Sequence, residues 1–245
     1  MRILAIGDIH GCSRAFDTLI DAVSPEPDDQ IITLGDYVDR GPDSRGVLDR
    51  LIALQDGGSL AALRGNHDAM MLEAREGRNL GWLACGGKQT LASYGFSEEK
   101  IREFANAEFW CYAREALMEK IPARHWKFLE DDCKPWYETD KHLFVHANIY
   151  PDLPLDEQPE YMLYWEKLSE PSAHVSGKVV VCGHTRQKNG LPLDLETAIC
   201  IDTGAYDDGW LTCLEVLSGR IWQANELGKA RTGWLHECNQ WDELT

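Results

Sequence analysis

Three short apolar runs, each followed by a glycine-containing polar loop, constrain the fold of this chain more than any other feature. The runs are RILAI (2–6), IITL (31–34) and SLAAL (59–63), and the loops after them begin GD, GD and RGNHD. Segments with apolar residues at helical spacing, 13–23 and 44–55, separate the runs. Alternation of strand and helix is typical of parallel sheets, so the sequence predicts an α/β fold built from βαβ units.

The range 69–133 has a different character. It lacks strand alternation, and a stretch such as KIREFANAEFWCYAREALMEKI (100–121) is typical of helix. Strands are predicted to resume afterwards at 142–148, 178–185, 197–204, 210–216 and 220–224. A hairpin turn is predicted to join the last two. We therefore predict one domain spanning residues 1–245, with a helical insertion at about 69–133.

The charge balance limits the partners of this chain. It carries 41 acidic and 24 basic residues, a formal net charge of -17. Such an excess argues against nucleic acid or a membrane surface as the partner, and an anionic substrate would need a locally positive site. The eight cysteines are scattered and no apolar stretch approaches a membrane span. We expect a cytoplasmic protein with reduced thiols, and the sequence leaves its oligomeric state open.

Polar side chains with metal-binding potential follow five of the predicted strands. They occur in the sequences GDIHG (7–11), GDYVDRG (35–41), RGNHD (64–68), VHAN (145–148) and CGHT (182–185). Ligands of α/β proteins bind beyond the carboxyl ends of the strands, so these loops are expected to meet. Aspartate, histidine and asparagine without thiolates suit Mn²⁺, Fe²⁺ or Zn²⁺. The ligands exceed what one ion needs, which favours two ions sharing a carboxylate, as in two-metal phosphoester sites.

A simpler explanation applies to each motif taken alone. A Gly-Asp pair is usually a turn and a single histidine is usually structural, so His125, His142, His174 and His236 are assigned no function. Five polar clusters at five strand ends are harder to explain as turns, which favours a functional site. The sequence GGKQT (86–90) lacks the spacing of a phosphate-binding P-loop and is interpreted as a tight turn between helices.

Taken in order, these five motifs resemble the phosphoprotein phosphatase family of calcineurin-like metallophosphoesterases, over roughly residues 1–216. The compact bacterial members of that family are similar, and they include serine/threonine protein phosphatases and symmetrical diadenosine tetraphosphatases. The resemblance implies a sandwich of two mixed β-sheets with helices on both outer faces. It also implies a metal-dependent phosphoester hydrolase in which a hydroxide bridging two divalent ions, most simply Mn²⁺, attacks phosphorus.

The resemblance also implies roles for individual residues. Asp8, His10 and Asp36 would hold one ion. The second would be held by Asp36, which bridges, together with Asn66, His146 and His184. His67 would be the general acid, oriented by Asp39, and Arg40 and Arg64 would face the phosphate. Arg186, directly after GHT, is interpreted either as a further contact to substrate phosphate or as a solvated loop arginine.

The substrate is less constrained than the chemistry. RGNHD ends in Asp68, as often in the tetraphosphatases, where protein phosphatases usually have glutamate. VDRG with Asp39, in contrast, is the form typical of protein phosphatases. We expect a serine/threonine protein phosphatase that also accepts small phosphomonoesters, with symmetrical diadenosine tetraphosphate hydrolysis as the alternative. An inactive binding module that keeps the fold is a remote third reading, because no ligand is missing.

Overall fold

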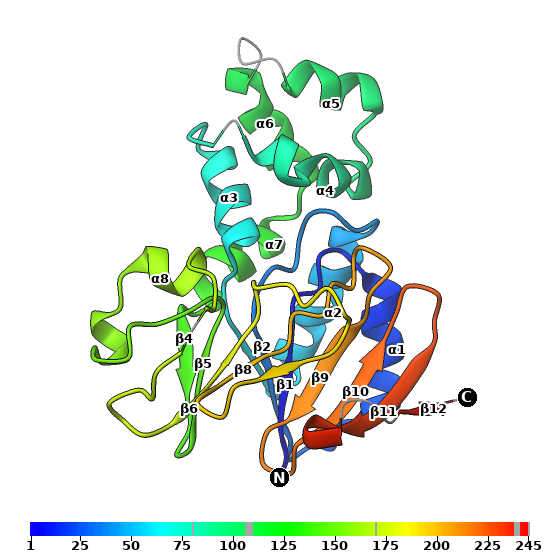
Figure 1. Ribbon diagram of the computed structural model, residues 1–245. Coiled ribbons are helices and arrows are strands. Elements are labelled where there is room, and N and C mark those ends of the chain that lie inside the picture. Colours follow the sequence, from blue (N-terminus) through cyan, green and yellow to red (C-terminus); the bar gives the residue numbers. More distant parts are fainter. Residues whose placement is uncertain (80, 106–109, 170, 238–240, 245) are drawn as a thin grey trace.

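The protein is a sandwich of two mixed β-sheets with helices on both outer faces, and a helical segment stands above one end of it (Figure 1). The computed structural model describes residues 1–79, 81–105, 110–169, 171–237 and 241–244, except for the side chains of 110–112. The α/β fold class and the two mixed sheets predicted from the sequence are confirmed.

The larger sheet has seven strands in the order β12-β11-β10-β9-β1-β2-β3. One end of it is parallel, since β1 pairs with β2 and β2 with β3 in the same direction, while β9 joins β1 antiparallel. The strands are β1 (Ile3–Ile6), β2 (Gln30–Thr33), β3 (Leu60–Ala62), β9 (Leu211–Glu215), β10 (Arg220–Ala224), β11 (Ala230–Trp234) and β12 (Asp242–Leu244). A 3-10 turn, η5 (Leu235–Glu237), follows β11.

The smaller sheet has five strands in the order β4-β5-β6-β8-β7. Strands β5, β6 and β8 are parallel, and β4 and β7 add antiparallel edges. The strands are β4 (Trp136–Glu138), β5 (His142–Val145), β6 (Val179–Cys182), β7 (Leu193–Asp194) and β8 (Ala198–Cys200). The strands β4, β7, β11 and β12 were not predicted. Of these, β4, β7 and β12 are edge strands of only two or three residues, which carry little periodicity of their own.

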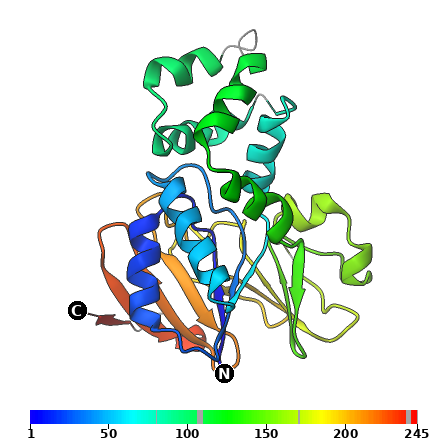
Figure 2. The same cartoon turned by 180° about the vertical axis from the view of Figure 1, so that it is seen from behind.

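Alternate residues of each strand belong to different layers of the core. In β1, Ile3 and Ala5 pack against Phe144 and Val181 of the other sheet, whereas Leu4 and Ile6 belong to the cluster under the helices. That alternation is the period-two geometry of a strand. Helices α1 (Ser13–Val23) and α2 (Ser44–Asp56) cover the larger sheet, as the rear view shows (Figure 2). On the smaller sheet, η4 (Leu155–Glu157) and α8 (Glu160–Tyr164) pack against β5, β6 and β8 in a further cluster of buried residues.

Between β3 and β4 the described residues form helices and turns. The elements are α3 (Asn66–Arg75), η1 (Trp82–Cys85), α4 (Gly87–Ser93), α5 (Glu98–Phe104), α6 (Trp110–Lys120), α7 (Ala123–Lys127) and η3 (Phe128–Asp132). Helix thus begins at Asn66 and not at Ala69, and residues 106–109 of the predicted stretch lie outside the described part. Trp82 and Leu91 share a buried cluster with Val47 and Leu51 of α2, so the segment is packed onto the sandwich.

Two expectations concern features of the whole chain. The described cysteines carry free thiols, buried at Cys12, Cys133, Cys182, Cys200 and Cys213 and exposed at Cys85. Among the helices that the structure describes, none is both long and apolar enough to cross a membrane.

Candidate active site

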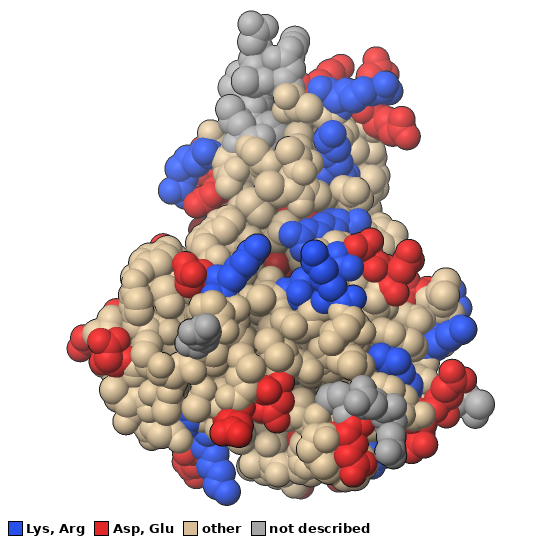
Figure 3. Space-filling view, viewed as in Figure 1, with Lys and Arg blue, Asp and Glu red and all other residues tan. Residues whose placement is uncertain are grey.

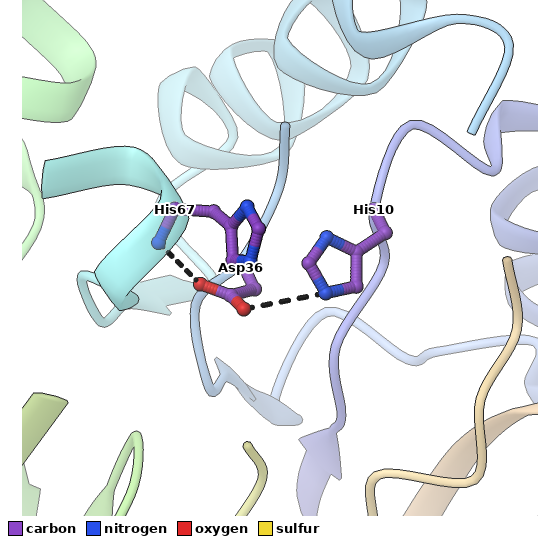
Figure 4. Close-up of side chains that lie close together, drawn as sticks. All are labelled: His10, Asp36 and His67. Carbon is purple, nitrogen blue, oxygen red and sulfur yellow. Dashed lines mark hydrogen bonds and ion pairs between the residues drawn. The ribbon is translucent and has the colours of Figure 1, made fainter. Parts of the chain in front are cut away.

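The polar loops predicted to meet do meet, above the carboxyl ends of β1, β2, β5 and β6 and the N-terminus of α3. Asp36, in the loop after β2, is the residue that joins them. Its carboxylate lies 3.3 Å from His10 Nε2 and 3.5 Å from His146 Nε2, and it accepts the backbone N–H of His67 at 2.9 Å. Figure 4 shows His10 and His67 on either side of this carboxylate.

The convergent atoms form two groups. In the first, His10, Asp36 and His67 each offer one ligand atom, and these atoms all lie within 4.8 Å of one another. In the second, Asp36, His146 and His184 meet the same condition. The side-chain oxygen of Asn66 completes the second group, 3.0 Å from His146 Nε2 and 3.0 Å from His184 Nδ1. Asp36 belongs to both groups, which is the arrangement that a bridging ligand requires.

The protonation of the histidines suits a cation. One ring nitrogen of each points at a backbone carbonyl: His10 Nδ1 at Val38 (2.9 Å), His146 Nδ1 at Leu34 (2.9 Å) and His184 Nε2 at Trp165 (3.1 Å). A carbonyl only accepts, so that nitrogen carries the proton and the other presents a lone pair. Burial lowers the pKa of His10 and His146, and burial together with His146 lowers the pKa of His184 to about 4.

Several lone pairs therefore point at one another without a proton between them. Around Asn66, the imidazole nitrogens of His146 and His184 face an amide oxygen that can only accept. A divalent cation that binds nitrogen and oxygen ligands would resolve this conflict. The donor set fits the two-metal centre expected from the sequence.

Asp8 is placed differently from the other expected ligands. Both of its carboxylate oxygens lie 3.1 Å from the backbone nitrogen of His184, so it braces the loop after β6. Burial, Asp202 and Asp36 raise the pKa of its carboxyl group well above the usual value. In the described part of the chain it lies outside both groups of convergent atoms, and its role as a ligand stays a prediction.

His67 and Asp39 form a buried pair. His67 Nδ1 lies 2.8 Å from Asp39 Oδ2, and the Asp39 carboxylate also accepts Trp82 Nε1–H at 2.9 Å and the Thr90 hydroxyl at 2.7 Å. Burial opposes the imidazolium, but Asp36 and Asp39 outweigh it and raise the pKa of His67. At Asp39 burial also opposes the charged form, and there it raises the pKa of the carboxyl group.

Sequence reasoning missed Trp82 and Thr90. Both come from the helical segment, and the stretch around Thr90 was interpreted as a tight turn. In the structure, residues 87–90 instead form the first turn of α4, which presents the Thr90 hydroxyl to Asp39. Asp68 was also given no role, yet it accepts the backbone N–H groups of Asp36 (2.8 Å), Tyr37 (3.0 Å) and Gly65 (2.9 Å). It thereby fixes the second polar loop against the third.

The three expected arginines have different surroundings. Arg40 reaches into the site, with Nη1 2.9 Å from His10 Nε2 and Nη2 2.8 Å from His67 Nε2. Arg186 forms an ion pair with Asp207 at 2.5 Å. Arg64, expected to face the phosphate, instead donates from Nε to the carbonyl of Leu129 and from Nη2 to that of Glu130.

The course of Arg64 has a local cause. Carbonyls at the C-terminal end of a helix lack partners within the helix and attract cationic donors. Leu129 and Glu130 lie in η3, the last helical turn before β4. The guanidinium of Arg64 is therefore directed to the helical segment, and its contact with phosphate stays a prediction.

The comparisons with known proteins agree with this geometry. The family model of the calcineurin-like phosphoesterases matches residues 1–188, most of the chain. The chain belongs to this family. It is accordingly a metal-dependent phosphoester hydrolase, and the family uses a dinuclear centre of divalent ions.

Two kinds of relative stand out from the sequence comparison. Serine/threonine-protein phosphatase 1 of Salmonella typhimurium is 31% identical over 222 residues, covering 87% of this chain and 91% of that protein. The symmetrical bis(5'-nucleosyl)-tetraphosphatase of an Acidovorax species is 45% identical over only 78 residues, 31% of this chain and 27% of the tetraphosphatase.

Solved structures share the fold. A proposed diadenosine tetraphosphatase superposes with a TM-score of 0.61 at 21% identity, covering 95% of this chain and 94% of the other. A cold-active protein tyrosine phosphatase gives a TM-score of 0.59 at 17% identity, covering 98% and 80%.

Backbone conformation also marks the site of this phosphoesterase. In the described chain, five site residues have positive φ angles: His10 (46°), Asp36 (53°), Asp39 (75°), Arg40 (68°) and His184 (60°). Residues other than glycine adopt this region at a cost, and such conformations cluster at functional sites. The tight loops turn these side chains inward, above the strand ends.

Proposed function

We propose that this phosphoesterase hydrolyses phosphoserine and phosphothreonine in proteins and also accepts small phosphomonoesters. The observation that carries the proposal is the His67–Asp39 pair, with 2.8 Å between its atoms and a raised pKa at His67. A serine or threonine alkoxide is a poor leaving group, and a positioned acid that protonates it removes that obstacle. The similarity to a serine/threonine-protein phosphatase along 91% of its length supports the same substrate class.

The residues that would hold the ions are those that the family resemblance implies, and Asp36, which belongs to both convergent groups, would bridge them. We assign the first ion to Asp8, His10 and Asp36, and the second to Asp36, Asn66, His146 and His184. We propose Mn²⁺ for both positions, with Fe²⁺ or Zn²⁺ as substitutes, because the donor set contains only nitrogen and oxygen. The ions would activate water for attack on phosphorus and offset charge on the phosphoryl oxygens.

The remaining residues bind the substrate and move a proton. His67 Nε2 is the atom that would protonate the departing oxygen, and Asp39 holds the ring so that this nitrogen faces Arg40 and the centre. Arg40 would bind the phosphate, Arg64 would approach it on binding, and Arg186 would make a further contact with the bound substrate. Together with the ions, these guanidinium groups would give a protein of net charge -17 a locally positive site.

Symmetrical hydrolysis of diadenosine tetraphosphate is the second candidate. The 45% identity to a tetraphosphatase over 78 residues and the fold shared with a proposed diadenosine tetraphosphatase favour it. Asp68 favours it as well, because this position often holds aspartate in the tetraphosphatases. Against it stand the short extent of that match and the complete His67–Asp39 pair.

One experiment decides between the candidates. The purified protein, loaded with Mn²⁺, is offered a phosphoserine peptide and diadenosine tetraphosphate at equal concentrations. We expect a larger kcat/KM for the peptide, followed by release of inorganic phosphate, than for the dinucleotide, followed by release of ADP. A larger kcat/KM for the dinucleotide, with ADP as the product, would transfer the assignment to the second candidate.

A further inference from the structure

Tyr206, in the loop between β8 and β9, lies against two arginines at the edge of the metal centre. The guanidinium carbon of Arg40 is 4.5 Å from the centre of its ring, and that of Arg186 is 5.3 Å from the same point. The ring also packs edge-on against the imidazole of His10 at 4.9 Å. The ring of Tyr206 therefore holds the guanidinium groups of Arg40 and Arg186 next to each other, and it also contacts the candidate metal ligand His10.

Arg186 is built into this position and is not a freely moving surface side chain. Its side chain is 31% exposed, and its Nη1 is paired with Asp207, which lies in the same loop as Tyr206. The Arg186 side chain lies so close to Gly204 that a Cβ at position 204 would be 2.6 Å from Nε of Arg186. Gly204 also has a φ of 72°, which favours glycine. The loop thus has both the conformation and the space that this arginine needs.

The two arginines differ in what already neutralises them. Arg40 lies 2.9 Å from His10 Nε2 and 2.8 Å from His67 Nε2, and it forms no ion pair with a carboxylate in the described chain. The partner of Arg186 is Asp207, whose side chain is 60% exposed and which can swing into water without a burial cost. Asp207 therefore occupies the place beside Arg186 that an anion from outside could take.

We propose that Arg186, held by Tyr206, binds a second anionic group of the substrate, next to the phosphoryl group that Arg40 and the metal centre hold. The proposal rests on the proposed function and specifies it further: preferred substrates carry a phosphate or carboxylate adjacent to the scissile phosphate. Asp207 is the internal group that this second anion displaces.

The charge distribution on this face agrees with a multiply charged substrate. Lys and Arg side chains gather in the middle of the face shown in Figure 3, below the helical segment, while Asp and Glu side chains lie mostly around them. A protein of net charge -17 repels anions in general. The cations gathered on this face would therefore steer an anionic substrate to this face.

The first test compares two competitors of p-nitrophenyl phosphate hydrolysis at a fixed concentration of free Mn²⁺. Inorganic phosphate has one anionic group and pyrophosphate has two. Arg186→Gln should raise the Ki of pyrophosphate by about tenfold and that of phosphate much less, because the lost contact is a charge-assisted hydrogen bond to the second group. Equal changes in both constants would overturn the proposal.

Matched variants separate this effect from general loss of charge. Arg50→Gln removes an exposed arginine that pairs with Asp17 on the helices and should leave the ratio of the two constants as it is. Asp207→Asn should lower the Ki of pyrophosphate, because the competing carboxylate is gone. Tyr206→Leu should lose the wild-type ratio with metal content unchanged. A Tyr206→Leu protein with the wild-type ratio would remove Tyr206 from the proposal.

The source of the second anion is tested with two phosphopeptides that differ only in glutamate or alanine next to phosphoserine. If the second group is a carboxylate, the wild-type enzyme prefers the glutamate peptide in KM and Arg186→Gln abolishes that preference. If it is a phosphate, only pyrophosphate responds to the substitution, and a response of neither ligand overturns the proposal. The competitor test needs no protein substrate, so it remains decisive even if the phosphopeptides are not hydrolysed.

Discussion

The imidazole of His67 and the carboxylate of Asp39 lie 2.8 Å apart, and the carboxylate is held from its other side by Trp82 and Thr90. The loop after β2 supplies Asp39 and the start of α3 supplies His67, whereas Trp82 and Thr90 belong to η1 and α4. The helical segment thus reaches the reacting part of the centre. It fixes the group that orients the proposed general acid.

This pair makes a prediction that depends on the leaving group. A serine alkoxide needs a proton to depart, whereas p-nitrophenolate leaves with little help. We expect His67→Asn to lower kcat for a phosphoserine peptide by about 10²–10⁴-fold and kcat for p-nitrophenyl phosphate distinctly less. Asp39→Asn should show the same order more weakly, since it only misorients the acid.

The comparison needs metal content to match the wild type and chemistry to limit the rate with both substrates, which a viscosity series checks. If His67→Asn then slowed both reactions equally, His67 would be a phosphate-binding group and not the acid.

Asp36 makes a prediction about the ions, because it belongs to both convergent groups. Chelation should abolish hydrolysis and Mn²⁺ should restore it. Asp36→Asn should lower kcat/KM by more than about 100-fold and reduce the bound metal at both positions, measured by elemental analysis. The matched control is Asp43→Asn in the same loop, where the side chain caps α2 and asparagine caps equally well. Full activity of the chelated protein would contradict the two-metal assignment.

Most of the parallel strands were predictable because a strand buried on both faces has a continuous run of apolar residues. Residues 31–34 are all buried, and Gly35 follows at once. The edge strands had no such signal, since β12 is exposed throughout and is defined by its pairing with β11. Their existence depends on a partner strand and not on their own sequence.

The candidate site was predictable only where function requires particular residue types at strand ends. His10, Asp36 and His146 met that condition and lie together. Trp82 and Thr90 did not, because tryptophan and threonine in a helical segment are common in any core. The direction of Arg64 follows from a rotamer choice and from the carbonyls of η3, and neither is visible in the sequence.

Gly65 makes a prediction about packing in the centre. Its φ of -95° is open to any residue, but a Cβ there would lie 2.1 Å from Asp36 Oδ1 and 2.3 Å from Asp36 N. Gly65→Ala should therefore displace Asp36, lower metal affinity, and reduce the free energy of unfolding by about 1–3 kcal/mol. Gly57→Ala, where a Cβ would meet the carbonyl oxygens of Leu54 at 3.3 Å and Ala53 at 3.7 Å, is the control and should change neither quantity appreciably. Normal metal binding by Gly65→Ala would show that the loop yields without cost.

His125 lies in α7, and its side chain is fully buried. Its Nδ1 is 2.7 Å from the Tyr94 hydroxyl and its Nε2 is 3.1 Å from Asp49, which also pairs with Arg124. Burial, and then Arg124 and Arg45, lower the pKa of His125 to about 4. The folded state therefore holds this histidine neutral.

The pH dependence of stability follows from that shift. An unfolded histidine has a pKa near 6.5, so below that pH the unfolded chain binds a proton that the folded chain refuses until about pH 4. His125 thus contributes no pH dependence above about pH 7, and stability falls as pH decreases from 6.5 to 4, by up to about 3 kcal/mol. Urea unfolding at pH 7.5, 5.5 and 4.5 should show a smaller fall for His125→Gln than for the wild type, although the variant is less stable at pH 7.5. His236→Gln, at an exposed histidine, should keep the wild-type slope. If His125→Gln also kept that slope, the proton that destabilises the folded protein in this range would bind elsewhere.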